Sequence, residues 1–271
     1  MLHDFEFRAP KTRAELLQVL ADHGGLAKLM AGGTDVIVNL RAGAIKPRVV
    51  VDVKQVEGYG ALAWSDAEGL VIRPATTIND LLRLPGLRER FPLLHACAHD
   101  LASYQIRNRA TVIGNIVNAS PCADMAPALL CLDARAVIAS QAGEHEVPMR
   151  DFITGVKRTV LLPGEVLDRV VVPAASAGAR GGYAKLKRIN GHDLGLVAVA
   201  VHKHDGELRV AVGSAAPTPV MVAGLGENDD AASVVAAARA VISPISDLRC
   251  TKEYREHMVG VYIRRLLREV A

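Results

Sequence analysis

The sequence predicts an α+β protein of two domains, on three observations. Short apolar segments with strand-like patterns alternate with helical patterns through residues 1–173. A stretch rich in Ala, Gly and Ser follows at 174–182 and has the composition of a linker. Beyond it, three candidate strands precede two helices that end the chain. A chain of 271 residues, half of them hydrophobic, is long enough for two such cores.

The expected strands are short and separated by turn residues. They lie at 5–7, 26–30, 49–53, 70–73, 135–140, 145–148 and 166–172, with three more at 183–188, 196–202 and 208–212. Helices are expected where a capping signal precedes apolar residues. Thr12 and Glu15 have the spacing of a capping box, and Thr77 precedes a run of leucines. Further helices are expected at 123–132, in the alanine-rich run 231–240 and at the end of the chain.

Two stretches interrupt this pattern. The glycine loop, Ala31-Gly-Gly-Thr-Asp35, separates an expected strand from an apolar segment at 36–40. The 103–121 segment is polar, too irregular for a helix and too long for a simple turn. Long ordered loops in compact domains are frequently functional, so we expect the function of the first domain here.

The composition argues against several classes of protein. The formal net charge is +3, and no dense Lys/Arg stretch is interleaved with aromatic residues, so nucleic-acid binding is not expected. The four cysteines are far apart, which argues against a metal or iron–sulfur site in this chain. Residues 1–10 lack the features of a secretory signal, and no apolar run reaches the roughly 20 residues of a membrane helix. A reducing, cytoplasmic setting is expected.

The glycine loop has the chemistry of a phosphate-binding turn. Gly32 and Gly33 leave backbone N–H groups unobstructed, and Thr34 adds a hydroxyl, so together they can bind a pyrophosphate. The alternative is a purely structural turn, since the loop lacks the G-x-G-x-x-G spacing of a Rossmann site.

The 103–121 segment and the residues after it offer complementary groups. Gly114, Asn115, Asn118 and Ser120 supply amides and a hydroxyl for phosphates, and Asp124 supplies a carboxylate for ribose hydroxyls. The alternative is a polar loop that only satisfies its own backbone. Two such segments in one chain favour the binding interpretation.

These residues carry a resemblance to a known family. The motifs are Ala31-Gly-Gly-Thr-Asp35, Gln105-Ile-Arg-Asn108, Thr111-Val-Ile-Gly-Asn115, Asn118-Ala-Ser-Pro121 and Asp124. They resemble the two pyrophosphate loops of the FAD-binding medium subunits of molybdenum hydroxylases, the carbon monoxide dehydrogenase and xanthine dehydrogenase type. The similarity continues through 159–165, Lys185, Asp193, 212–219, 246–249 and 253–255, and so covers nearly the whole chain.

The resemblance implies a fold and a function. Residues 1–173 would form an FAD-binding domain of the vanillyl-alcohol-oxidase (PCMH) type with two subdomains, and 178–271 a flavoprotein C-terminal domain. The chain would be an oxidoreductase subunit that holds FAD. Its partners would be a molybdopterin-binding large subunit and a small subunit with two [2Fe-2S] clusters, in a dimer of heterotrimers. Electrons would leave to an external acceptor, for which NAD, oxygen, a quinone or another carrier all stay open.

The family's flavin contacts carry over position by position, with no catalytic side chain among them. Those expected around the diphosphate are Leu29, Met30, Ala31, Gly32, Gly33, Thr34, Asp35, Val36, Thr111, Ile113, Gly114, Asn115 and Ser120. Asp124 is expected at the ribose, and Leu101, Leu167 and Lys185 near the flavin, where Lys185 would stabilise negative charge on the reduced ring.

The chain departs from the family pattern at three positions. Ala110 and Ile113 replace glycines, and Asn190 stands where arginine is frequent. If Ile113 required a disfavoured backbone conformation, strain of about 1–3 kcal/mol would weaken the loop. Two alternatives therefore stay open: a scaffold subunit that has lost or weakened FAD binding, and a free-standing FAD oxidase of the same fold.

Other candidates have simpler explanations. His192, His202 and His204 are expected to be surface or core histidines, and Cys122 a small packing residue. The stripe Tyr254, Met258, Tyr262 and Leu266 is expected to be the apolar face of the last helix.

Overall fold

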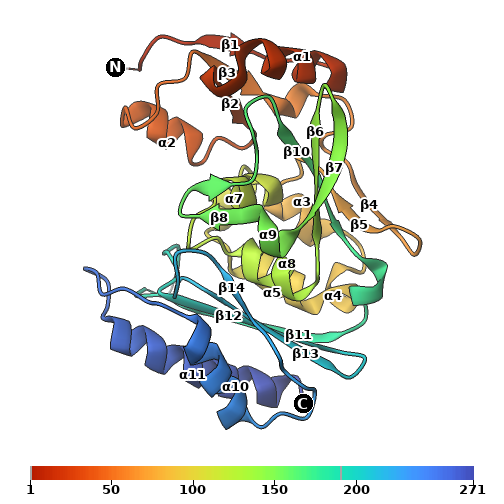
Figure 1. Ribbon diagram of the computed structural model, residues 1–271. Coiled ribbons are helices and arrows are strands. Elements are labelled where there is room, and N and C mark those ends of the chain that lie inside the picture. The colour runs from red at the N-terminus through yellow and green to blue at the C-terminus, as the bar shows by residue number, and fades with distance from the viewer. Residues whose placement is uncertain (1, 190) are drawn as a thin grey trace.

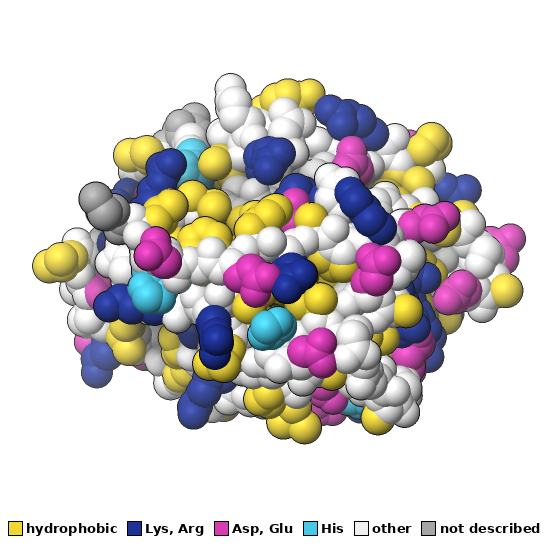
Figure 2. Space-filling view, turned by 90° about the horizontal axis from the view of Figure 1, so that it is seen from above, with side chains coloured by type: hydrophobic (Ala, Val, Ile, Leu, Met, Phe, Trp, Pro, Cys, Tyr) yellow, Lys and Arg dark blue, Asp and Glu magenta, His cyan; other side chains and the backbone are white. Residues whose placement is uncertain are grey.

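The three larger sheets are arranged along the length of the molecule, with helices between and below them (Figure 1). The computed structural model describes residues 2–189 and 191–271. The N-terminal sheet lies at one end, a five-stranded sheet in the middle, and a four-stranded sheet with the C-terminal helices at the other end. The surface at the N-terminal end carries hydrophobic, basic and acidic side chains interspersed with one another (Figure 2). Within the described residues, no helix is both long and apolar enough to cross a membrane.

The N-terminal sheet is parallel, with β3 between β1 and β2. Helix α1 begins with the predicted capping box of Thr12 and Glu15, and its Leu16 and Leu20 pack against the buried valines of β3. The elements of this subdomain are β1 (Glu6–Arg8), α1 (Arg13–His23), η1 (Gly24–Leu26), β2 (Ala27–Met30), α2 (Val36–Arg41), β3 (Val49–Asp52) and η2 (Val53–Gln55).

The middle sheet is antiparallel, in the order β4-β5-β10-β6-β7. Its central strand β10 has a register shift against β6 between Leu167 and Arg169, which is a β-bulge. The strands are β4 (Leu62–Ser65), β5 (Gly69–Ile72), β6 (Arg135–Ser140), β7 (Gly143–Pro148) and β10 (Val166–Val172).

Short helices pack with the middle sheet around the largest apolar core. A two-stranded hairpin, β8 (Ile153–Gly155) with β9 (Arg158–Thr159), projects beside them. The helices are α3 (Ile78–Arg83), α4 (Leu87–Arg90), α5 (Pro92–Asp100), α6 (Tyr104–Arg107), α7 (Val112–Val117), α8 (Met125–Cys131) and α9 (Met149–Phe152).

The C-terminal sheet is antiparallel and has helices on both faces. In β12, Val197, Val199 and Val201 pack into the core with α10 and α11, whereas Ala200 faces α5 and α8. The small alanine side chains let those two helices approach the sheet closely. The elements are η3 (Ala174–Ser176), β11 (Arg180–Leu186), β12 (Val197–His204), β13 (Glu207–Gly213), β14 (Val220–Val222), α10 (Ala231–Val241) and α11 (Lys252–Glu269).

The structure corrects several sequence predictions. The 103–121 segment is not irregular, because it contains α6 and α7, two helices too short to show a hydrophobic period. Strands β4 and β14 were not predicted. The linker is shorter than expected, because β11 already begins at Arg180.

The burial of single residues was also predicted only in part. Tyr254 is exposed and does not belong to the buried stripe of α11. The expectation for His202, a surface or core histidine, is confirmed, because His202 is buried, and burial lowers its pKa to about 4.

Candidate functional site

A cavity of about 440 Å³ lies where the glycine loop meets the first turn of α7. This volume is within the range of known small-molecule and cofactor sites. Twelve of the residues predicted to bind the cofactor line it: Leu29, Ala31, Gly32, Gly33, Thr34, Asp35, Val36, Thr111, Ile113, Gly114, Asn115 and Leu167. The structure therefore brings together segments that are some 80 and 130 residues apart in the chain.

The two predicted loops touch each other through backbone atoms. A Cβ atom added to Gly32 would lie 1.7 Å from the carbonyl oxygen of Arg109, so only glycine fits there. Gly33 has a φ of +76°, in the left-handed region that favours glycine. Gly114 donates its N–H to Thr111 Oγ1 at 2.9 Å, which makes Thr111 the N-cap of α7. The glycine loop and the first turn of α7 therefore both contribute to the lining of the cavity, and this part of the lining is called its floor.

Unused backbone donors gather in this floor. In the described ranges, the N–H groups of Gly32, Gly33, Thr34 and Asp35 donate no hydrogen bond to another protein atom. The first N–H groups of a helix likewise have no intrahelical acceptor, and α7 begins at Val112. Orphan N–H groups without obstructing side chains form a site for an anion such as a diphosphate.

The rest of the lining is mostly apolar and neutral. Its hydrophobic members include Leu29, Val53, Leu161, Val166 and Leu167. A polar floor with apolar walls suits a ligand that joins a diphosphate to planar rings, which is the chemistry of FAD. The residues present therefore fit this cofactor.

A polar chain crosses one edge of the cavity. Asn118 Nδ2 donates to Asp35 Oδ1 at 2.9 Å, and Lys157 Nζ donates to Asn118 Oδ1 at 2.9 Å. All three residues line the cavity, and each comes from a different segment. Lys157 was not predicted, because it lies on a hairpin turn whose position cannot be read from sequence.

Five predicted residues lie outside the cavity lining: Met30, Leu101, Ser120, Asp124 and Lys185. Asp124 and Lys185 bind each other, with 2.8 Å between Oδ1 and Nζ, and Tyr183 also donates to Asp124. Burial raises the pKa of Asp124, although the charge of Lys185 opposes this effect. The pair joins the N-terminal end of α8 to β11.

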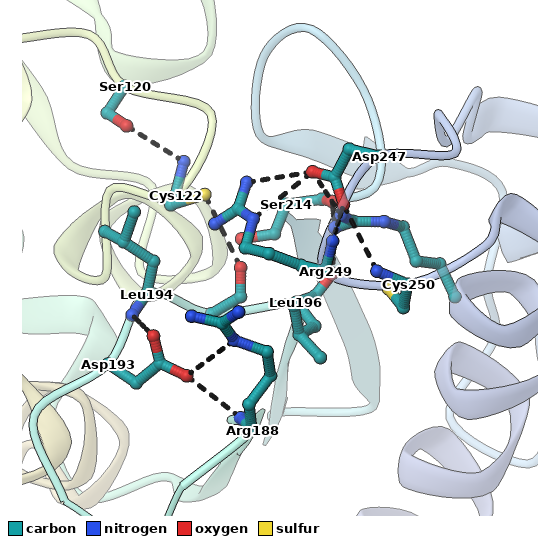
Figure 3. A network of polar contacts seen from close by, with 12 residues as sticks. Ser120, Cys122, Arg188, Asp193, Leu194, Leu196, Ser214, Asp247, Arg249 and Cys250 are labelled. Carbon is teal, nitrogen blue, oxygen red and sulfur yellow. Dashed lines mark hydrogen bonds and ion pairs between the residues drawn. The ribbon is translucent and has the colours of Figure 1, made fainter.

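A second polar network connects the end of the 103–121 segment to the C-terminal domain (Figure 3). Cys122 N donates to Ser120 Oγ at 3.2 Å, and Cys122 Sγ donates to the carbonyl of Gly195 at 3.5 Å. Arg249 donates to Asp247, whose pKa falls to about 2, chiefly because it accepts the backbone N–H of Arg249. Ser120 and Cys122 thus have structural contacts of their own.

Sequence reasoning missed a buried carboxylate next to the cavity. Asp168 follows the cavity residue Leu167 at the bulge of β10, and its side chain is 1% exposed. It accepts hydrogen bonds from Tyr59 at 2.9 Å, Arg13 at 2.9 Å and Arg73 at 2.8 Å. These donors belong to both subdomains, so Asp168 fixes one relative to the other.

The two departures that lie in the described residues, Ala110 and Ile113, cause no backbone strain. Among the described residues, neither Ala110 nor Ile113 has a positive φ. Ile113 lies in the first turn of α7 and is buried in the main core. The expected strain is therefore absent. Asn190 lies outside the described residues.

A two-loop cradle in a two-subdomain α/β domain, followed by a smaller α+β domain, defines a flavoprotein of the FAD-binding type. Comparisons agree. Residues 3–175 match the family described as FAD binding domain in molybdopterin dehydrogenase, and 182–270 match the CO dehydrogenase flavoprotein C-terminal domain. The chain belongs to this family of FAD-binding oxidoreductase subunits.

Individual relatives align over nearly their whole length. The carbon monoxide dehydrogenase medium chain of Hydrogenophaga pseudoflava is 30% identical, over 97% of this chain and 96% of the relative. A putative xanthine dehydrogenase FAD-binding subunit of Escherichia coli (strain K12) is 30% identical, over 99% and 97%. In solved structures, the Hydrogenophaga carbon monoxide dehydrogenase matches with a TM-score of 0.92 at 29% identity, covering 100% of this chain and 98% of that one.

A second solved structure extends the similarity beyond carbon monoxide and xanthine dehydrogenases. Quinoline 2-oxidoreductase from Pseudomonas putida 86 has a TM-score of 0.90 at 26% identity, covering 100% of this chain and 98% of that one. The fold is thus common to relatives whose names give different substrates.

Proposed function

We propose that this chain is the electron-transfer subunit of a molybdenum hydroxylase complex. It receives electrons from the [2Fe-2S] clusters of a small subunit and passes them to an external acceptor, while a molybdopterin large subunit carries out the hydroxylation. The names of the relatives, medium chain and FAD-binding subunit, support a multi-subunit assembly. We propose a dimer of heterotrimers as its form.

One observation carries the assignment of the cofactor site. The glycine loop and the segment that leads into α7 meet backbone to backbone at Gly32 and Arg109, both segments line one cavity, and the N–H groups of residues 32–35 donate to no other protein atom in the described ranges. We infer that these amides bind the diphosphate of FAD. The twelve lining residues are the proposed contacts, and Met30, Leu101, Ser120, Asp124 and Lys185 stay predictions that rest on the resemblance.

The redox chemistry belongs to the flavin when it is bound. The chain's own residues bind it, orient it and exclude water from it. Apolar side chains such as Leu167 and Val166 supply the dry wall, and the arginines around Asp168 hold that wall in place. Substrate identity would be determined in the large subunit.

The boundary between the two domains and the cellular compartment are also proposals. We propose a boundary between residues 173 and 178, where η3 separates the middle sheet from the C-terminal sheet. We place the protein in the cytoplasm, since the four cysteines are all free thiols.

The test is an absorption spectrum of the purified chain across the flavin bands, with and without added FAD. The chromophore is then released and identified. Flavin bands and recovered FAD support the proposal, and electron transfer from a purified iron–sulfur partner to the bound flavin would extend it. A colourless chain that ignores added FAD would favour the scaffold, and reduction of the flavin by a small organic substrate without partners would favour the free-standing oxidase.

A further inference from the structure

Charged side chains are few in the lining of the FAD cavity. Of the residues that line it, the charged ones are Lys28, Asp35 and Lys157. Asp35 is therefore the carboxylate that a bound anion would meet, and it repels a diphosphate. The cations available in the lining to offset it are the two lysines.

Lys157 is held at this cavity by an unusual backbone. It has a φ of +58°, and its N–H donates to the carbonyl oxygen of Ala119 at 2.8 Å. Ala119 itself has a φ of +45° and follows Asn118 at the end of α7. A left-handed conformation costs a non-glycine residue free energy, so two of them in contact are kept by their surroundings. Such strain gathers at functional sites.

The charge of Lys157 is not neutralised by its partner. Its Nζ donates to the neutral amide of Asn118, whose own Nδ2 donates to Asp35. The asparagine therefore separates the lysine from the carboxylate. A nearby lysine shows the contrast: Lys54 also reaches the glycine loop, at the carbonyl of Ala31, but is paired with Asp52. Lys157 is exposed and can redirect its flexible side chain at little cost.

We propose that Lys157 is a cofactor-binding residue that leaves Asn118 and pairs with the diphosphate when FAD binds. The diphosphate is the anionic part of oxidised FAD, and it requires a positive charge to balance Asp35. In the absence of FAD, the hydrogen bond to Asn118 keeps the Lys157 side chain at the cavity. The proposal rests on FAD binding by this family and adds a residue that the two backbone loops do not supply.

The experiment measures the dissociation constants of FAD and riboflavin with the full chain stripped of flavin, at low and high KCl. Lys157→Asn removes the charge while tolerating the left-handed backbone. Lys157→Arg retains the charge. Arg158→Asn is the matched control, since Arg158 is the next cation in the same hairpin and does not line the cavity.

We expect Lys157→Asn to weaken FAD binding about tenfold at low salt and to reduce its salt dependence, as for loss of one phosphate ion pair. Riboflavin binding stays unchanged, Lys157→Arg retains most of the FAD affinity, and Arg158→Asn stays within about twofold of the parent. Equal FAD affinity in Lys157→Asn and the parent overturns the proposal. So does an equal loss of FAD and riboflavin, which indicates a structural defect. A parent chain that binds no FAD overturns the cofactor assignment itself.

Discussion

Lys185 Nζ lies 2.8 Å from Asp124 Oδ1, and the two side chains are 2% and 12% exposed. One residue comes from the C-terminal sheet and the other from the start of α8, so the pair crosses between the two parts of the chain. Asp124 also neutralises the charge of Lys185, which the resemblance implies would stabilise the reduced flavin. The geometry therefore gives Lys185 a structural role at this interface.

Lys185→Met is expected to lower the free energy of unfolding by about 3–5 kcal/mol, because it leaves the carboxylate of Asp124 buried and unpaired. Lys187→Met is the control, since Lys187 pairs with Asp100 at 2.7 Å in a more exposed place and should cost about 1 kcal/mol or less. Urea denaturation measures both. Because Asp124 neutralises Lys185, the flavin reduction potential of Lys185→Met should change little. A large fall in that potential, with stability retained, would support the electrostatic role that the resemblance implies for Lys185.

Local signals were readable in the sequence, and long-range contacts were not. The capping box of Thr12 and Glu15 depends on two nearby side chains and was confirmed, as was the hairpin of β6 and β7. The glycine loop and the start of α7 were found as motifs, and the structure places them around one cavity. The position of Lys157 depends on how a hairpin packs, so no local pattern reveals it.

The Asp168 network shows the same limit more strongly. Its donors Arg13, Tyr59 and Arg73 precede it by 95 to 155 residues, and each alone looks like an ordinary polar residue. Asp168 also lies at a bulge, where the alternation of buried and exposed side chains changes. A sequence pattern of period two therefore cannot show that this carboxylate is buried.

Asp168→Asn is expected to cost about 3 kcal/mol of stability at neutral pH, because the partly exposed arginines around this buried carboxylate lose their charge partner. Burial alone would raise the pKa of Asp168, but hydrogen bonds from Tyr59 and Arg13 outweigh it and the pKa is lowered. A carboxyl with a lowered folded pKa stabilises the fold above its unfolded value of about 3.9, and that contribution is lost as the pH falls below it.

Urea unfolding from about pH 7 down to about pH 3 tests this linkage. The parent should lose stability below about pH 4 more steeply than Asp168→Asn. Glu146→Gln is the control, since Glu146 pairs with Arg135 at the surface and its loss should leave the acid limb intact. Parallel acid limbs in the parent and Asp168→Asn would show that the network contributes no such linkage.

Gly32→Ala is expected to abolish stable FAD binding. The added methyl group would lie 1.7 Å from the carbonyl of Arg109, which is fixed backbone, so the two loops must separate. Gly60→Ala is the matched control, because a Cβ there meets nothing within 4 Å. Flavin content per chain, read from absorbance, should fall at least about tenfold in Gly32→Ala alone. Full flavin content in that variant would show that the loops do not form the cradle.

Ile113→Gly restores a glycine that the family uses, and it separates two explanations of this departure. If the isoleucine strained the loop, glycine would improve FAD binding. The structure predicts the opposite, because Ile113 has an ordinary helical backbone and is buried in the core between the middle sheet and its short helices. The substitution removes that packing and adds glycine's conformational entropy, so it should cost about 3 kcal/mol or more.

Thermal unfolding of the flavin-free chain measures that cost, and a titration with FAD measures the affinity. Val112→Gly, one position earlier in the same turn and also buried, is the control for loss of packing without the family match. Both variants should be less stable, and neither should bind FAD more tightly than the parent. Tighter binding by Ile113→Gly alone would mean that the isoleucine obstructs the cofactor, since Ile113 is also one of the cavity-lining residues.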